Sequence, residues 1–409
     1  MKVRSSRTIA LLVLLTTITL SAQESENSLE DYISDLKQKQ FMYDYEKNEA
    51  ESSKLRDTWI APINLSYTYN RSNSNPTVSG EVETRSAVIK MDQPIFQSGG
   101  IYYGIKFANA SREYSDYSID VAKRKMIKDA IALLMQIKQS DLKIKRQRLQ
   151  IENSQIGLEQ KKEQYMSGQL DSSFLDNAII ELNIVTQNLY DIETSKERLI
   201  SSFHTLSDLD YKTAKIPQLE LLTKEEFLNE NIQLQMAEAQ VERDRYSKNM
   251  TITQYLPSVN ITAGYTSTYT SNNFFANGER NYYDYGFRAT LPLSINTFRD
   301  IESARVDYLK SQVLKQDTVV KLDALFTQVM QNLDNLEKKR LLTLKNEELY
   351  SKLLKDTKEL YDAGYKTEYD VSLLQNSLDI AKTDAKIYEI DKQLELLTLY
   401  EMYVNTQGH

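Results

Sequence analysis

Residues 259–266 read Val-Asn-Ile-Thr-Ala-Gly-Tyr-Thr, and residues 283–291 read Tyr-Asp-Tyr-Gly-Phe-Arg-Ala-Thr-Leu. Apolar and polar residues alternate along both segments, which indicates β-strands with one apolar face and one polar face. Residues 63–69 alternate in the same way, and residues 82–93, which carry Lys90 and Asp92, do so less regularly. The sequence therefore predicts two β-hairpins, one at about 60–95 and the other at about 257–294.

The two predicted hairpins belong to two copies of one longer unit. Tyr165 and Gly168 recur as Tyr361 and Gly364, with the same offset in both cases (361 − 165 = 364 − 168 = 196). A repeat of this length indicates duplication of a whole domain. We therefore expect a first repeat at residues 23–206, a crossover linker at 207–222 and a second repeat at 223–409.

Long helices are predicted on either side of each hairpin. Glycine and proline number only 11 and 6 in 409 residues, so few positions break a helix. Apolar residues in the second repeat follow the alternating four- and three-residue spacing of a coiled-coil seam (Leu322, Phe326, Val329, Leu333 and Leu336).

The expected lengths of the helices predict how they are arranged. Two long helices, at about 104–166 and 299–363, would each measure roughly 90–100 Å. The shorter helices are expected at about 28–58, 171–206, 224–254 and 367–403. Within each repeat the two short helices together match the long one, so we expect them stacked end to end beside it, as antiparallel columns.

The N-terminal residues and the composition indicate an exported protein. Lys2, Arg4 and Arg7 precede an apolar run at residues 9–20, which is typical of a signal peptide covering residues 1–22. There is no cysteine and there are only two histidines, so neither thiol chemistry nor a histidine-rich metal site is predicted. The net charge of −8 argues against binding to nucleic acid.

The alternating segments fit strands that cross a membrane. Each is close to the roughly 9–11 residues of a tilted transmembrane strand, and the 27 tyrosines suit aromatic girdles at the membrane surfaces. A soluble sheet with one dry face has the same alternation, but no other segment is left to cover such a face.

A single chain does not supply enough strands for a barrel. Four strands cannot close in lipid, where every backbone donor needs a partner, so we expect the chain to oligomerise. Two chains would supply eight strands and three would supply twelve, and the larger barrel leaves an open lumen. The predicted fold is thus mainly α, with a long α-helical barrel and a trimeric 12-stranded β-barrel.

Three groups of residues carry a family resemblance. They are residues 93–100 with the second copy that starts at Leu291, residues 231–241 with the following 255–258, and the turns at 165–168 and 361–364. Through them the chain resembles the TolC-like outer-membrane efflux protein family. The resemblance implies a homotrimer in the bacterial outer membrane, in contact with its lipid, with the helical domain in the periplasm.

The resemblance also implies partners and a function. A periplasmic adaptor (membrane fusion) protein and an inner-membrane pump of the RND or ABC type would bind the channel. The chain would then be the exit duct of a tripartite efflux or type I secretion system, gated at its periplasmic tip by adaptor binding.

The turns between the helices have a physical explanation of their own. Gly168 and Gly364 suit the left-handed position that ends a helix, and Asp171 or Thr367 can cap the helix that follows.

The resemblance assigns further roles to residues at the two ends of the helices. The gate at the tip is expected to contain Tyr361, Asp370 and Tyr165. The turns that receive the adaptor are expected to contain Gly168, Ser172, Gly364 and Thr367. Junctions between barrel and helices are expected at Pro94, Gly99, Gly100, Pro257 and Pro292. Leu373 stands where some family members have a second acidic residue, and Phe174 matches Asp370 in the first repeat.

Two other classes of protein share parts of the pattern. Asp370 and Glu368 resemble a catalytic pair only in composition, because they lie on a solvated helix, so we expect no enzymatic activity and no catalytic or cofactor-binding residue. An adaptor protein also has long helical hairpins, but it would carry a lipoyl-like β-domain and a single hairpin. The scattered Asp and Glu residues predict an acidic lumen with a modest preference for cations.

Overall fold

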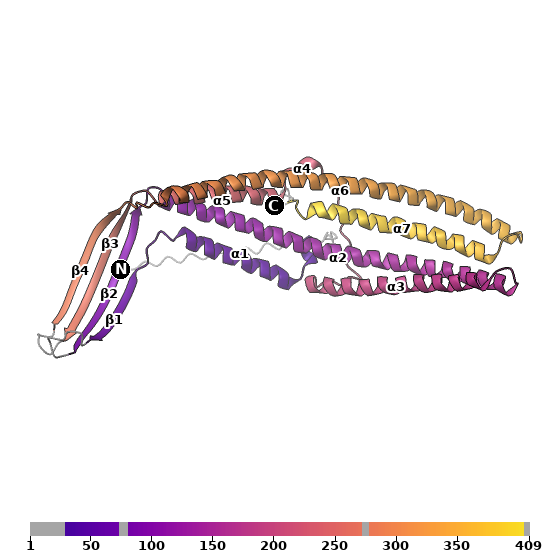
Figure 1. Cartoon of the computed structure of the whole chain (residues 1–409), viewed down its shortest axis with the longest axis horizontal. Helices are drawn as coiled ribbons and strands as arrows, with labels where there is room; N and C mark the ends of the chain where they lie inside the picture. The colour runs from indigo at the N-terminus through magenta and orange to yellow at the C-terminus, as the bar shows by residue number, and fades with distance from the viewer. Residues whose placement is uncertain (1–28, 73–80, 272–277, 405–409) are drawn as a thin grey trace, which may run out of the picture.

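The computed structural model describes residues 29–72, 81–271 and 278–404. A four-stranded sheet lies at one end of an elongated molecule, and long helices run from the sheet to the other end (Figure 1). The predicted signal peptide and the tips of both hairpins lie outside the described residues. Among the helices of the described part, none is both long and apolar enough to cross a bilayer.

The sheet is antiparallel and joins the two repeats. Its strands follow the order β1 (Asn64–Ser72), β2 (Val82–Phe96), β3 (Ser258–Ser271) and β4 (Gly278–Thr290). The two predicted hairpins are confirmed, and β2 pairs with β3 across the repeats. β2 runs to Phe96, beyond the predicted end at Gln93, and its register shifts between Pro94 and Phe96. This irregularity accommodates Pro94, because proline lacks an N–H group for the ladder.

The first repeat forms one long helix and two shorter ones. A short 3-10 helix, η1 (Leu29–Tyr32), precedes α1 (Asp35–Arg56), and α2 (Gly100–Met166) and α3 (Ser172–Leu206) follow the hairpin. Figure 1 shows α1 and α3 one after the other along α2, which confirms the predicted stacking.

The second repeat contains α4 (Lys224–Asn229), α5 (Ile232–Thr253), α6 (Thr297–Asp362) and α7 (Glu368–Tyr400). The prediction of one continuous helix at 224–254 is wrong, because the chain breaks between α4 and α5. Asn231 caps α5 at this break by accepting hydrogen bonds from the backbone N–H groups of Gln233 and Leu234. An asparagine side chain competes in this way with helix continuation.

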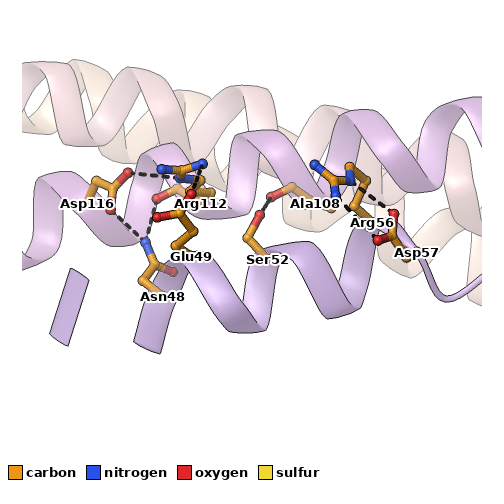
Figure 2. Close-up of polar contacts among 8 residues, drawn as sticks. All are labelled: Asn48, Glu49, Ser52, Arg56, Asp57, Ala108, Arg112 and Asp116. Carbon is orange, nitrogen blue, oxygen red and sulfur yellow. Dashed lines mark hydrogen bonds and ion pairs between the residues drawn. The ribbon is translucent and has the colours of Figure 1, made fainter. Parts of the chain in front are cut away.

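Small and polar side chains join α1 to α2 near the sheet (Figure 2). Ala108 on α2 is completely buried, and its carbonyl oxygen accepts a hydrogen bond of 3.2 Å from the Ser52 hydroxyl on α1. Asn48 donates to the Asp116 carboxylate at 2.8 Å and to the Arg112 carbonyl at 3.1 Å. This part of the helical column is therefore held by close approach and polar contacts.

The larger of two clusters of buried apolar side chains lies near the middle of the columns, and we call it the mid-height core. The core combines the junction of α1 and α3, the centre of α2, the end of α7 and the crossover linker. Its largest fully buried side chains include Phe203, Ile131, Leu134 and Met135. The Tyr32 hydroxyl donates to a linker carbonyl at 2.9 Å, which fastens the linker to this core.

A second buried cluster adjoins the mid-height core on the α6 side. Phe227 of α4 and Phe326 of α6 lie with their ring centroids 5.8 Å apart. Leu322 and Val329 of the predicted coiled-coil seam are also buried here, which confirms that this stripe of α6 faces the rest of the chain. Apolar packing is therefore concentrated at the level where the short helices meet.

Candidate functional site at the helical tip

Both interhelical turns lie at the end of the molecule opposite the sheet (Figure 1), and their backbones are nearly identical. Gly168 follows α2 with φ of 74° and Gly364 follows α6 with φ of 81°. The N–H groups of these glycines bond to the carbonyls of Tyr165 and Tyr361, each at 2.9 Å. The next N–H in each turn reaches back five residues, which completes a Schellman motif. The predicted left-handed caps are thus confirmed.

The helices that leave the two turns are capped differently. The Asp171 carboxylate accepts from the Ser173 N–H at the start of α3. At the start of α7, the Thr367 hydroxyl accepts from the Asp370 N–H, and the Asp370 carboxylate accepts from the Thr367 N–H at 3.0 Å. The sequence predicts both caps, but the structure gives Asp370 a local role: its carboxylate completes a capping box.

The predicted gate and docking residues gather at this tip. Tyr165 and Tyr361 are 44% and 43% exposed in the single chain, so both rings remain available to other surfaces. Ser172 and Thr367 are exposed at the starts of α3 and α7. A Cβ atom at Gly168 or Gly364 would meet no atom within 4 Å, so the turns are open to the outside.

One contact at the tip is missing from the sequence prediction. The Tyr369 hydroxyl on α7 donates to the Glu163 carboxylate on α2 at 3.2 Å. This hydrogen bond is the first cause of the raised pKa of Tyr369, which therefore stays protonated and able to donate. No sequence signal identifies the pair, because it depends on how α2 and α7 are aligned.

The Tyr369–Glu163 contact is the last of a series between the two repeats. Further contacts between α2 and α7 join Asn153 to Asn376 at 3.0 Å, Arg146 to Asp384 at 3.0 Å and Gln139 to Asp391 at 2.5 Å. We call these four contacts the polar seam. It runs from the tip toward the mid-height core, so hydrogen bonds join the tip halves of α2 and α7 along their length.

The predicted junction residues lie where strands become helices. Gly99 has φ of 92° and forms the N-cap position of α2, and the Ser98 hydroxyl donates to the Pro257 carbonyl at 2.6 Å. Pro94 lies inside the end of β2, whereas Pro292 lies in the segment between β4 and α6. The two copies therefore cross from sheet to helix by different routes.

The sheet beyond these junctions has two chemically different faces. The register places odd-numbered residues on one face, which is largely apolar and aromatic (Leu65, Tyr67, Tyr69, Ile89, Met91, Ile261, Tyr265, Tyr269, Tyr283, Tyr285 and Phe287). Arg85 shares this face near the hairpin tips, 5.9 Å from the ring centroids of both Tyr69 and Tyr269. The even-numbered face is mainly polar.

The described parts of the chain contain no group of three His, Cys, Asp or Glu side chains placed to hold a metal ion.

Solved outer-membrane channels share this arrangement. The outer membrane protein VceC from Vibrio cholerae superposes with a TM-score of 0.70 at 14% identity, over 92% of this chain and 95% of that one. The Campylobacter jejuni CmeC outer membrane channel superposes with a TM-score of 0.71 at 13% sequence identity, over 93% of this chain and 86% of that one. The open state of the Neisseria gonorrhoeae MtrE outer membrane channel superposes with a TM-score of 0.65 at 13% sequence identity, over 91% of this chain and 87% of that one.

The fold is therefore that of an outer-membrane channel. Residues 224–402 match the family model of the outer membrane efflux protein, whereas comparison with curated protein sequences gave no match. The second repeat therefore resembles an outer membrane efflux protein domain, which confirms the resemblance to the TolC-like family that the sequence predicts and agrees with the predicted localisation in the outer membrane.

Proposed function

We propose that three copies of this chain form the exit duct of a tripartite efflux or type I secretion system. The open, two-faced sheet is the observation that carries this proposal. Among the described residues, β1 and β4 each pair on one side only, and Tyr283 and Phe287 on the apolar face are 75% and 80% exposed. In lipid, unpaired strand edges are too costly to leave open.

Pairing β4 of one chain with β1 of the next satisfies both edges. Three chains then close a barrel of twelve strands, with the apolar face toward lipid and the polar face toward water. The helices continue from the barrel as a tunnel through the periplasm. Substrates pass through this duct without a catalytic step.

The mass of the detergent-extracted protein tests the assembly. We expect light scattering on material from the outer-membrane fraction to give the mass of a trimer after subtraction of detergent. A soluble monomer would mean that the apolar face is covered within one chain, and the duct would have to be abandoned.

The proposed gate is the helical tip. The polar seam lies between α7 and α2 near the tip, and each hydrogen bond of this kind contributes only about 0.5–1.5 kcal/mol of net stability. The mid-height core, by contrast, is apolar and buried. Adaptor binding favours a dilated tip to the extent that the adaptor binds the dilated form more tightly than the closed form.

Conductance measurements test the gate. Replacing Tyr361 by Ala removes a ring beside the turn of α6, so we expect a higher basal conductance in planar bilayers. Tyr369→Phe removes only the hydroxyl that bonds to Glu163 and should produce a smaller increase. Tyr43→Ala, an exposed tyrosine on α1, is the matched control. Equal conductance in all of these proteins would argue against a gate at the tip.

Adaptor docking at the turns can be tested by cross-linking. The chain lacks cysteine, so Ser172→Cys and Thr367→Cys each introduce a single reactive thiol at a turn. We expect both variants to cross-link to the periplasmic adaptor in cells that produce it. Ser201→Cys, far from the tip on α3, is the control, and equal cross-linking from all three sites would contradict docking at the turns.

A further inference from the structure

The polar face of the sheet carries its charges unevenly. Toward the hairpin tips this face presents mostly Ser and Thr, with Arg280 lying apart from the other charges. From the middle of the sheet toward the helices it presents Lys90 and Asp92 on β2 and Asp284 and Arg288 on β4. We call these four residues the charge belt. Its two positive and two negative charges balance within one chain.

Asp92 connects three strands of the sheet. Its carboxylate accepts a 2.7 Å hydrogen bond from the Asn260 side chain on β3 and lies 3.3 Å from the Arg288 guanidinium on β4. The Asp92 and Arg288 side chains are nevertheless 47% and 65% exposed. Ion pairs as exposed as this contribute little to stability, so the charges can be changed without dismantling the sheet.

Asp284 occupies a position that depends on the glycine opposite it. The register places Lys90, Gly264 and Asp284 in one row across β2, β3 and β4. A Cβ atom at Gly264 would lie only 2.7 Å from the Asp284 carboxylate oxygen. The bare backbone at Gly264 therefore lets this carboxylate lie over the middle strand, on the face that also carries Lys90.

We propose that the charge belt sets the charge selectivity of the barrel and keeps it open to hydrophilic solutes of either sign. This inference rests on the proposed function, because the polar face lines a lumen only when the barrel closes. An aqueous lumen with low-dielectric walls focuses the field of its fixed charges. The chain as a whole carries −8, whereas the belt is neutral, so the barrel lacks the cation preference of an acidic tunnel.

Reversal potentials of the reconstituted channel in a KCl gradient test the belt. Asp284→Asn leaves one extra positive charge per chain, and Lys90→Gln leaves one extra negative charge. We expect the ratio of K⁺ to Cl⁻ permeability to change by about two-fold or more, downward for Asp284→Asn and upward for Lys90→Gln. Both shifts should shrink between about 0.1 M and 1 M salt, because the Debye length falls from about 10 Å to about 3 Å.

A carboxylate outside the belt provides the control. Glu279 lies on the same strand as Asp284 but on the apolar face near the hairpin tips, so Glu279→Gln should leave the permeability ratio unchanged. Shifts in the same direction for Asp284→Asn and Lys90→Gln, or no shift in either, would overturn the proposal while leaving the duct intact. If the unchanged protein forms no channel, the proposed function fails and the belt fails with it.

Discussion

Thr367 and Asp370 bond to each other across the first turn of α7, and this makes the tip sensitive to acid. The backbone N–H of Thr367 is the first cause of the lowered pKa of Asp370, and that of Ser173 is the first cause for Asp171. A carboxylate with a lowered folded-state pKa stabilises the fold above its unfolded-state pKa. That stability is lost as the pH falls through the folded-state pKa.

We therefore expect the first turns of α3 and α7 to fray below the usual pKa range of aspartate. Amide hydrogen exchange at the tip, corrected for the intrinsic rate, should accelerate there relative to the mid-height core. Asp370→Asn should abolish most of this pH dependence in α7 and leave that of α3. Thr367→Ala should weaken the turn at neutral pH by about 1 kcal/mol. Parallel pH profiles at the tip and in the core would contradict this prediction.

At the residue scale, sequence reasoning succeeds where a side chain acts on its own neighbours. Gly168, Gly364, Asp171 and Thr367 are predictable because their roles depend on a few adjacent residues. Glu163 and Tyr369 are not, because their hydrogen bond requires the alignment of two helices from different repeats.

At the scale of the strand, two neighbouring tyrosines provide a matched test of which face meets lipid. Tyr283 lies on the apolar face of β4, and Tyr282 lies on the polar face opposite Thr266. Tyr283→Lys should destabilise the inserted protein by about 2–4 kcal/mol, as expected for lysine near the middle of a bilayer, whereas Tyr282→Lys should cost much less. Unfolding in urea from lipid vesicles measures both, and equal losses would argue against the assignment of the faces.

Element boundaries were predictable to the extent that local patterns determine them. Periodicity alone located both long helices and all four strands. It did not reveal the break before α5, although Asn231 is a residue that favours a helix start. Nor did it show that β2 continues past Pro94, since the partner β3 supplies the hydrogen bonds that extend the strand.

At the scale of the whole molecule, the mid-height core should dominate the stability of the helical part. Phe203 is completely buried there, whereas Phe174 near the tip is 50% exposed. Phe203→Ala should destabilise the helices by about 3–5 kcal/mol, and Phe174→Ala should have a small effect. Chemical unfolding followed by the helical circular dichroism signal tests this, and similar midpoints for the two variants would contradict it.

The arrangement of the columns follows from helix lengths, and this is why it was predictable. Two short helices match one long helix, so their junction must fall near the middle. The sequence did not predict that most apolar burial would gather at that junction, because the tip halves contain enough leucine to suggest uniform packing. The polar seam between α2 and α7 shows that a different chemistry joins the repeats below the core.

The mid-height core lies at the level about which the tip halves of the helices would rotate. Below it, α3 extends 35 residues to the tip, which is a lever arm of about 50 Å at 1.5 Å per residue. A rotation of about 5° at the core therefore displaces the end of a helix by about 4 Å over such an arm. In the proposed duct, a slight repacking of side chains in the mid-height core would therefore be converted into a much larger change in the width of the tip.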